Sequence, residues 1–191
     1  MIDIVVLNLK KVFSKVILVT NDVAAYEYLG VKLVKDVIPG MGPLSGMHAG
    51  LLASGDWYNF IIACDMPFLE PALIRFMLGK AEGYDIVAPR IEGYFQPLHA
   101  VYARSCIEPI QECLKQNITK IVAFYPQMRL LAIEEEDLRR FTDIRRTFFN
   151  INTPEELQQA RLLAKGGGRN AGTGKGAGSF TGCGEAGLTG G

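Results

Sequence analysis

The stretch Asn59–Phe68 reads NFIIACDMPF and decides the fold. Its apolar run from Phe60 to Cys64 is typical of a strand buried on both faces of a parallel sheet. Asp65 is the only acid in the stretch and stands where this strand ends, and Pro67 stops the strand from continuing. Because ligands in open α/β sheets gather at the carboxyl ends of strands, the stretch predicts an α/β fold with a candidate site at Asp65.

The position of Asp65 supports two interpretations. A lone carboxylate at a strand end is a typical way to hold Mg²⁺ on a nucleotide, since phosphate oxygens and water complete the octahedral shell. An aspartate here can equally cap the turn or helix that follows Pro67. The first glycine of the chain is Gly30, so no glycine-rich phosphate loop opens the sequence. Position alone leaves both interpretations open.

Composition limits the classes of function. The 191 residues are 49% hydrophobic, which is enough for one domain with a full core. Twenty acids balance twenty bases, so the charge gives no reason to expect a nucleic acid or an anionic membrane as partner. Arg139, Arg140, Arg145 and Arg146 cluster among acids, which predicts a solvated face.

The cysteines and the first residues predict a cellular compartment. The four cysteines form no C-x-x-C pair and the chain has two histidines, so we expect no zinc site. No signal peptide is recognisable, and Met1–Phe13 is too short and too mixed in polarity to span a membrane. We therefore expect a cytoplasmic protein with reduced thiols.

Hydrophobic periodicity predicts strands that alternate with helices. This alternation favours a three-layer α/β/α sandwich with a mainly parallel sheet, in which one strand returns antiparallel after Gly93. Ser45 is expected to cap one of the helices. Strands are expected at 16–20, 31–34, 60–64, 85–88, 96–103 and 129–133, and helices at 1–13, 24–29, 46–53, 71–80, 106–116 and 153–165.

The chain changes character after residue 165. Residues 166–191 hold 12 of the 21 glycines and few large apolar side chains, so this segment is expected to be a disordered tail behind a domain of residues 1–165. Within it, Gly172–Gly176 resembles a phosphate loop only superficially. Arg169 replaces the first glycine of such a loop, and Gly176 replaces the residue that would hold Mg²⁺.

Two further segments are candidates for ligand binding near Asp65. Asp36 follows the strand expected at 31–34 and could share a crevice with Asp65, although an ordinary loop acid is the simpler interpretation. The glycines of Gly40–Gly50 allow close approach of the backbone, either to a planar ligand or to a packed helix. Pro43 stiffens this segment and removes one donor.

Polar residues on two later segments complete the set of candidates. Asn150 and Asn152 flank Ile151 in an extended run, so both amides lie on one face and could bind a polar ring system. One of Asn152 and Thr153 is expected to cap the last helix. His99 on the return strand is more often a packed polar residue than a catalytic base.

Four motifs occur here in the same order as in molybdenum cofactor guanylyltransferases, and the chain is identified as a member of that family by them. The motifs are GPLSG at 42–46, ACDMPF at 63–68, QPL at 96–98 and FNINTPE at 149–155. The resemblance spans about residues 1–165 and implies a Rossmann-like fold similar to that of nucleotide-diphospho-sugar transferases. It implies transfer of GMP from GTP to the molybdopterin cofactor, with release of pyrophosphate.

The resemblance also implies roles for single residues. Asp65 resembles the Mg²⁺ ligand, which makes Mg²⁺ the expected cofactor, and Asp36 resembles a second aspartate that contacts the nucleotide. Asn150 and Asn152 resemble the asparagines on the molybdopterin side. Molybdoenzymes or their chaperones are further partners that the family would allow. The residues that resemble the guanine-reading loop are Gly42, Pro43, Leu44 and Gly46.

The chain departs from the family pattern at its front. Family members begin with a strand and a glycine-rich loop that binds the triphosphate, and Met1 corresponds to the helix after that loop. A strand, loop and turn of about 25–30 residues are therefore expected to be missing, which predicts slower catalysis. Two alternatives remain open: a molybdopterin cytidylyltransferase or other nucleotidyltransferase, and an inactive remnant or cofactor-binding partner subunit.

Overall fold

The computed structural model describes residues 2–36, 38, 40–151 and 179–183, the last range through its backbone. The helix expected at 153–165 and the candidate Asn152 lie outside the described residues.

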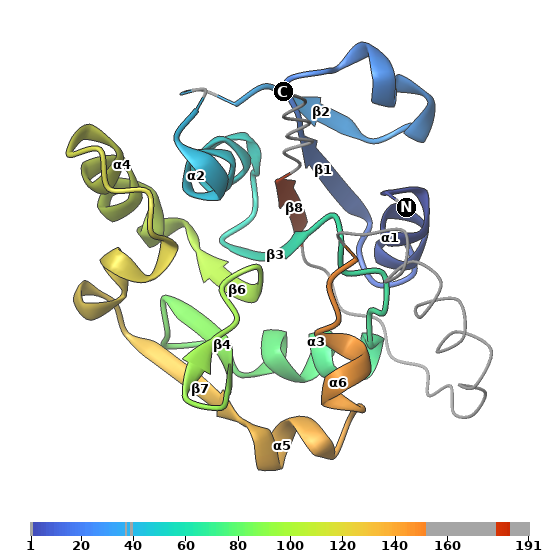
Figure 1. Cartoon of the computed structure of the whole chain (residues 1–191), viewed down its shortest axis with the longest axis vertical. Helices are drawn as coiled ribbons and strands as arrows, with labels where there is room; N and C mark the ends of the chain where they lie inside the picture. Colours follow the sequence, from blue (N-terminus) through green and yellow to red (C-terminus); the bar gives the residue numbers. More distant parts are fainter. Residues whose placement is uncertain (1, 37, 39, 152–178, 184–191) are drawn as a thin grey trace, which may run out of the picture.

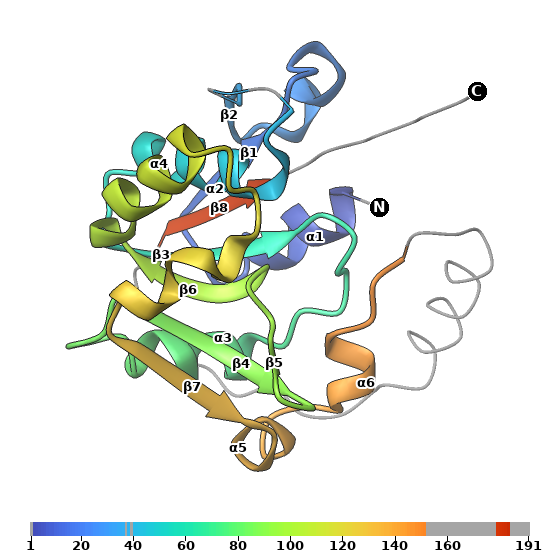
Figure 2. The same cartoon turned by 60° about the vertical axis from the view of Figure 1, so that its left-hand side comes forward.

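The described residues form an eight-stranded sheet. The sheet lies at the centre of the described structure, with helices on both sides (Figures 1 and 2). The strand order is β2-β1-β8-β3-β6-β4-β5, and β7 pairs with β4. β6 runs antiparallel to β3 and β4, β5 runs antiparallel to β4, and the other pairings are parallel. The expected mainly parallel sheet is thus confirmed. The strands are β1 (Lys15–Val19), β2 (Lys32–Val34), β3 (Tyr58–Ala63), β4 (Ile86–Ile91), β5 (Tyr94–Phe95), β6 (His99–Ala103), β7 (Leu130–Glu134) and β8 (Ser179–Cys183).

Helices cover both faces of this sheet and bury two hydrophobic cores. β3 alternates between the cores, because Phe60 and Ile62 face one and Ile61 faces the other. The first core packs under α1 (Ile2–Leu9), α3 (Pro71–Gly79), α5 (Glu135–Arg139) and α6 (Ile144–Thr147). The second packs under α2 (Gly42–Ala53), α4 (Ile107–Lys115) and the 3₁₀ helix η3 (Ile121–Gln127). The expected three-layer α/β/α arrangement follows from these two cores. Two shorter 3₁₀ helices are η1 (Ala24–Leu29) and η2 (Arg104–Cys106).

The return strand forms through a tight hairpin. Arg90 pairs with Phe95 and Ile91 with Tyr94, which leaves Glu92 and Gly93 as a two-residue turn. Both turn residues have positive φ (50° and 82°), as a hairpin that follows the twist of the sheet requires. β6 then runs antiparallel between β3 and β4, which confirms the predicted return strand over a shorter range.

The sheet position between β1 and β3 is filled by the C-terminal strand β8 (Figure 1). This arrangement differs from the disorder expected for residues 166–191, at least over Ser179–Cys183. It also changes the expectation of an absent central strand, because β1 and β3 each find a parallel neighbour in β8. A glycine-rich segment forms a strand here because two parallel neighbours offer hydrogen-bonding edges to it. The remaining residues of the predicted tail lie outside the described residues.

Candidate functional site

Asp65 lies at the carboxyl end of β3, where the sequence placed it. Its side chain is half-buried, with Oδ1 shielded from solvent. The backbone N–H of Ile151 donates a hydrogen bond of 3.0 Å to the Asp65 carbonyl oxygen. This contact brings the segment that contains Asn150 to the loop that contains Asp65.

Hydrogen bonds connect Asp36 to the start of α2. Its Oδ1 accepts a hydrogen bond of 3.1 Å from the Ile38 N–H and a short one from the Ser45 hydroxyl. Ser45 Oγ also lies 2.9 Å from the Ile38 carbonyl oxygen, so its single proton serves one acceptor at a time. The structure thus joins Asp36 to the GPLSG motif.

The GPLSG motif is helical rather than a loop, which corrects two expectations. α2 begins at Gly42, so Ser45 is a buried residue inside the helix and does not cap it. Pro43 near the first helical position explains the early start, because its fixed φ suits the first turn of a helix. Gly42 has a φ of 65°, a conformation that favours glycine. Leu44 and Gly46 are buried, so only the backbone of this turn is available for reading a base.

Asp36 and Asp65 both follow the carboxyl ends of parallel strands, on the same side of the sheet, but they are not adjacent. β2 and β3 are separated by β1 and β8 in the strand order. Three strand spacings place the ends of β2 and β3 about 14 Å apart. The two carboxylates therefore cannot share one metal ion, but an extended ligand across the ends of β1 and β8 would reach both.

Aromatic contacts hold the segment before Asn150 against the sheet. The ring of Phe148 lies 4.8 Å from that of His99 on β6, and His99 packs edge-on to Phe60 at 5.0 Å. His99 is fully buried, and both ring nitrogens lack a hydrogen-bond partner among the described residues. Burial lowers the pKa of His99 to about 3, which keeps the ring neutral at pH 7 and makes it a packing residue. Asn150 itself is exposed.

The arginine cluster is only in part the solvated face that the sequence predicted. Arg139 and Arg140 do form exposed ion pairs, with Glu135 and Asp137. Arg146 instead places its guanidinium 5.3 Å from the ring centre of Phe68, in the motif that contains Asp65. Sequence reasoning missed this contact because the charge run gave no sign that α6 lies beside that motif.

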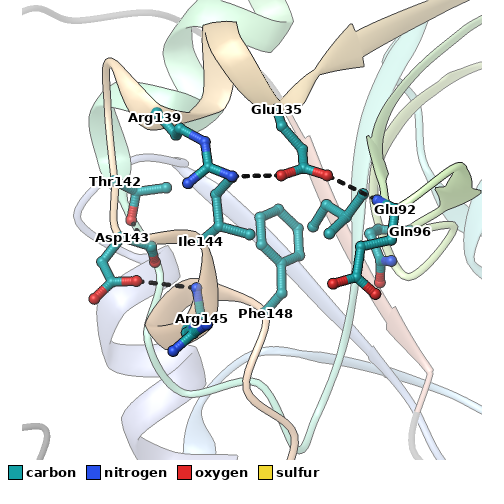
Figure 3. A pocket seen from close by; sticks show the side chains of 10 residues that line it. Glu92, Gln96, Glu135, Arg139, Thr142, Asp143, Ile144, Arg145 and Phe148 are labelled. Atoms are coloured by element: carbon teal, nitrogen blue, oxygen red, sulfur yellow. Dashed lines mark hydrogen bonds and ion pairs between the residues drawn. The ribbon is translucent and has the colours of Figure 1, made fainter.

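A polar pocket of about 640 Å³ adjoins this segment, and Figure 3 shows its lining. Glu135 forms one wall, where it accepts hydrogen bonds from Arg139 Nη2 at 2.6 Å and from the Glu92 N–H at 2.8 Å. The Glu92 hydrogen bond and the arginine lower the pKa of Glu135, so the carboxylate is charged. Gln96 from the QPL motif and Phe148 also line the pocket. Its volume is within the range of small-molecule sites.

The described residues contain no group of three or more His, Cys, Asp or Glu side chains that could hold a metal ion. Asp65 offers a single carboxylate, a type of ligand that suits a hard ion such as Mg²⁺. Within the same residues, no helix has the length and apolar character needed to cross a membrane.

Solved structures share this fold. Molybdopterin-guanine dinucleotide biosynthesis protein A from Archaeoglobus fulgidus aligns over 78% of both chains, with a TM-score of 0.68 and 29% identity. The 2-C-methyl-D-erythritol 4-phosphate cytidylyltransferase from Thermus thermophilus aligns over 85% of this chain and 88% of its own, with a TM-score of 0.65. At 13% identity, the second likeness concerns the fold alone.

Sequence relatives and a family model are more specific. A probable molybdenum cofactor guanylyltransferase from Pelotomaculum thermopropionicum is 43% identical over 82% of this chain and 77% of its own. A molybdenum cofactor guanylyltransferase from Desulfosudis oleivorans is 39% identical over 87% of this chain and 83% of its own. The model of the MobA-like NTP transferase domain matches residues 1–130. The chain therefore belongs to the molybdenum cofactor guanylyltransferase family of nucleotidyltransferases.

Proposed function

We propose that this chain transfers GMP from GTP to the molybdenum–molybdopterin cofactor and releases pyrophosphate. The observation that carries the proposal is the hydrogen bond from Ile151 to Asp65. This bond is made to the backbone carbonyl of Asp65, so it holds the asparagine segment expected on the acceptor side next to the residue whose carboxylate is suited to a metal-bound nucleotide. Membership of the guanylyltransferase family supports the choice of both substrates.

The nucleotide side of the proposed site runs along the carboxyl ends of the parallel strands. Asp65 would hold Mg²⁺ together with phosphate oxygens, and the ion would neutralise the charge that develops on the transferring phosphoryl group. Asp36 and the first turn of α2 would bind the nucleoside end. The first N–H groups of a helix have no partner within the helix, so the backbone of Gly42 and Leu44 can donate to a guanine.

The acceptor side would include the asparagine segment and the polar pocket. Asn150 is exposed beside the Asp65 loop, and Asn152 follows it in sequence. Arg145 on the pocket rim is exposed and would attract the terminal phosphate of molybdopterin. Protein partners such as molybdoenzymes or chaperones stay a prediction.

The reaction needs no protein nucleophile. An oxygen of the acceptor's terminal phosphate attacks the α-phosphorus of GTP and forms a new P–O bond. The bond from the α-phosphorus to the bridging oxygen breaks on the opposite side, and pyrophosphate leaves with that electron pair. The task of the protein is to hold both phosphates in line, which the shared sheet edge would do.

Calorimetric titration with GTP and Mg²⁺ tests the nucleotide half of this proposal. We expect GTP to bind more tightly than CTP, and Asp65→Ala to weaken the Mg²⁺-dependent binding at least about tenfold. Asp56→Ala is the matched control, since Asp56 precedes the same strand at its other end and pairs with Lys15 there.

The alternatives give different results in this titration and in a parallel titration with molybdopterin. Tighter binding of CTP would indicate a cytidylyltransferase. Binding of molybdopterin with no binding of either nucleotide would indicate a cofactor-binding protein without transferase activity, and would contradict the proposal. Equal effects of the Asp65 and Asp56 substitutions would remove Asp65 from the metal site.

A further inference from the structure

β8 completes the sheet from the far end of the chain. Ser179 lies in register with Lys15 and Asn59, and Cys183 lies in register with Val19 and Ala63. All five residues of β8 thus have a parallel partner on both sides. Figure 2 shows β8 between β1 and β3. β8 therefore holds a central position in the sheet, between two strands that precede it by more than 100 residues.

The two neighbours of β8 depend on it for pairing. On their other sides, β1 pairs with β2, and β3 pairs with β6. Four residues of β1 and four of β3 are buried, so these strands belong to the interior of the sheet. Without β8, both would leave a row of backbone groups unpaired beneath α2, which packs over β8. Buried backbone groups without a partner are costly.

The gap between β1 and β3 has the requirements of a strand-binding site. Backbone hydrogen bonds on both sides would give affinity and are tolerant of sequence, as in other cases of strand addition. The segment that fills it contains Phe180 and Thr181, both of types that favour strands, and no proline.

The chain is long enough to supply its own strand. Ile151 lies beside Asp65, at the carboxyl end of β3. Ser179 begins β8 beside Asn59, at the amino end of β3. The 27 residues 152–178 connect them. The distance from one end of these strands to the other is about 20 Å, whereas a connection of this length can span roughly 90 Å when extended. A tethered strand of this kind acts at a local concentration on the order of millimolar.

We propose that the gap between β1 and β3 is a binding site for a β-strand, filled by residues 179–183 of the same chain. The site accepts a free peptide of that sequence when the tethered strand is disabled. Because Cys183 is in register with Ala63, two residues before Asp65, the strand also completes the sheet edge at the candidate site.

Hydrogen exchange of the full chain, read by mass spectrometry, tests this proposal. Thr181→Pro removes a backbone donor from the middle of β8, and Thr173→Pro places a proline in the same glycine-rich tail outside the strand. We expect Thr181→Pro to raise exchange in β1 and β3 at least about tenfold, with β4 and β7 unchanged. Thr173→Pro should leave all four strands as they are.

A free peptide tests the binding site itself. A peptide of residues 177–184, added to the Thr181→Pro chain, should restore protection in β1 and β3. The same peptide with proline in place of Thr181 should not. A peptide that changes nothing overturns the strand-binding site, and equal exchange in the two proline variants overturns the role of β8. If Thr181→Pro also loses protection in β4 and β7, while Thr173→Pro keeps it in all four strands, the result still supports the role of β8.

Dilution distinguishes the chain's own strand from that of a second copy. Protection in β1 and β3 should be independent of protein concentration, because the occupant is tethered. Protection that falls on dilution would overturn the intramolecular assignment. None of these readouts involves a nucleotide, so they decide this proposal separately from the guanylyltransferase activity.

Discussion

Ile151 donates its N–H to the carbonyl oxygen of Asp65 at 3.0 Å and so joins two motifs that are far apart in sequence. Ile151 is buried, and Asn150 beside it is exposed. The backbone thus fixes the segment while the polar side chain before Ile151 stays available. This division of roles separates the structural part of the segment from its proposed ligand-binding part.

Asn150→Ala should therefore weaken molybdopterin binding without loosening the fold. The amide is exposed, so its loss should leave the free energy of unfolding within about 0.5 kcal/mol. Affinity for molybdopterin should fall about fivefold to tenfold, and affinity for GTP should not change. Fluorescence titration measures the first, and calorimetry the second. Gln116→Ala, an exposed amide at the end of α4, is the control. Equal molybdopterin affinity in both variants would remove Asn150 from the acceptor site.

Ser45→Ala tests the link between Asp36 and α2. The substitution removes the hydroxyl that donates to Asp36 but leaves the Ile38 N–H as a donor. We expect a loss of about 0.5–1.5 kcal/mol in the free energy of unfolding. GTP affinity should also fall a few-fold, because Asp36 would be held less firmly. Ser14→Ala at an exposed turn should change neither quantity. An unchanged GTP affinity in Ser45→Ala would show that Asp36 does not contact the nucleotide.

The parallel core of the fold could be predicted from the sequence, and its C-terminal strand could not. The run from Phe60 to Ala63 is apolar without a break, which identifies a central strand by itself. Ser179–Cys183 lies in a glycine-rich tail, and its pairing depends on two open strand edges that are distant in sequence. Local composition contains no information about such edges.

In the candidate site, too, some features can be predicted from the local sequence and others depend on packing between distant segments. The position of Asp65 just after a strand can be predicted from the sequence, whereas the contact of Arg146 with Phe68 depends on how α6 packs. The start of α2 cannot be predicted from Pro43, because proline stiffens a loop and also suits the first helical turn. The sequence pattern alone does not distinguish these two uses of proline.

Asp85 should be important for stability rather than for activity. It is buried at the start of β4 and accepts hydrogen bonds from Arg129 Nε at 3.0 Å and Ser105 Oγ at 2.7 Å. The Arg129 hydrogen bond is the main reason that the pKa of Asp85 is lowered. Its stabilising effect is therefore complete above about pH 4, the unfolded-state value, and is lost as the pH falls toward the folded-state value.

Asp85→Asn should lower the free energy of unfolding at pH 7 by about 1–3 kcal/mol, as measured by urea denaturation. Asp56→Asn disrupts an exposed ion pair with Lys15 and should cost less than about 1 kcal/mol. The Asp85 variant should also lose less stability than the wild type between pH 4 and pH 2. A parallel decline of both proteins over that range would contradict the role given to the carboxylate.

The burial of His99 should give the free energy of unfolding a second, separate dependence on pH. Its folded-state pKa of about 3 lies below the unfolded value near 6.5, so the unfolded chain binds the extra proton between these values. Stability from this group is thus complete above about pH 6.5 and falls with decreasing pH, by up to about 1.4 kcal/mol per unit.

His99→Phe should remove this dependence, because it keeps an aromatic ring between Phe60 and Phe148 but has no titrating group. Neither ring nitrogen of His99 has a hydrogen-bond partner among the described residues, so the exchange should cost less than about 1.5 kcal/mol at pH 7. Urea denaturation of both proteins from pH 7 to pH 4 measures the effect. His48, whose pKa is also lowered by burial, is present in both proteins and cancels in the difference. Equal slopes against pH would mean that His99 is accessible to protons in the folded chain.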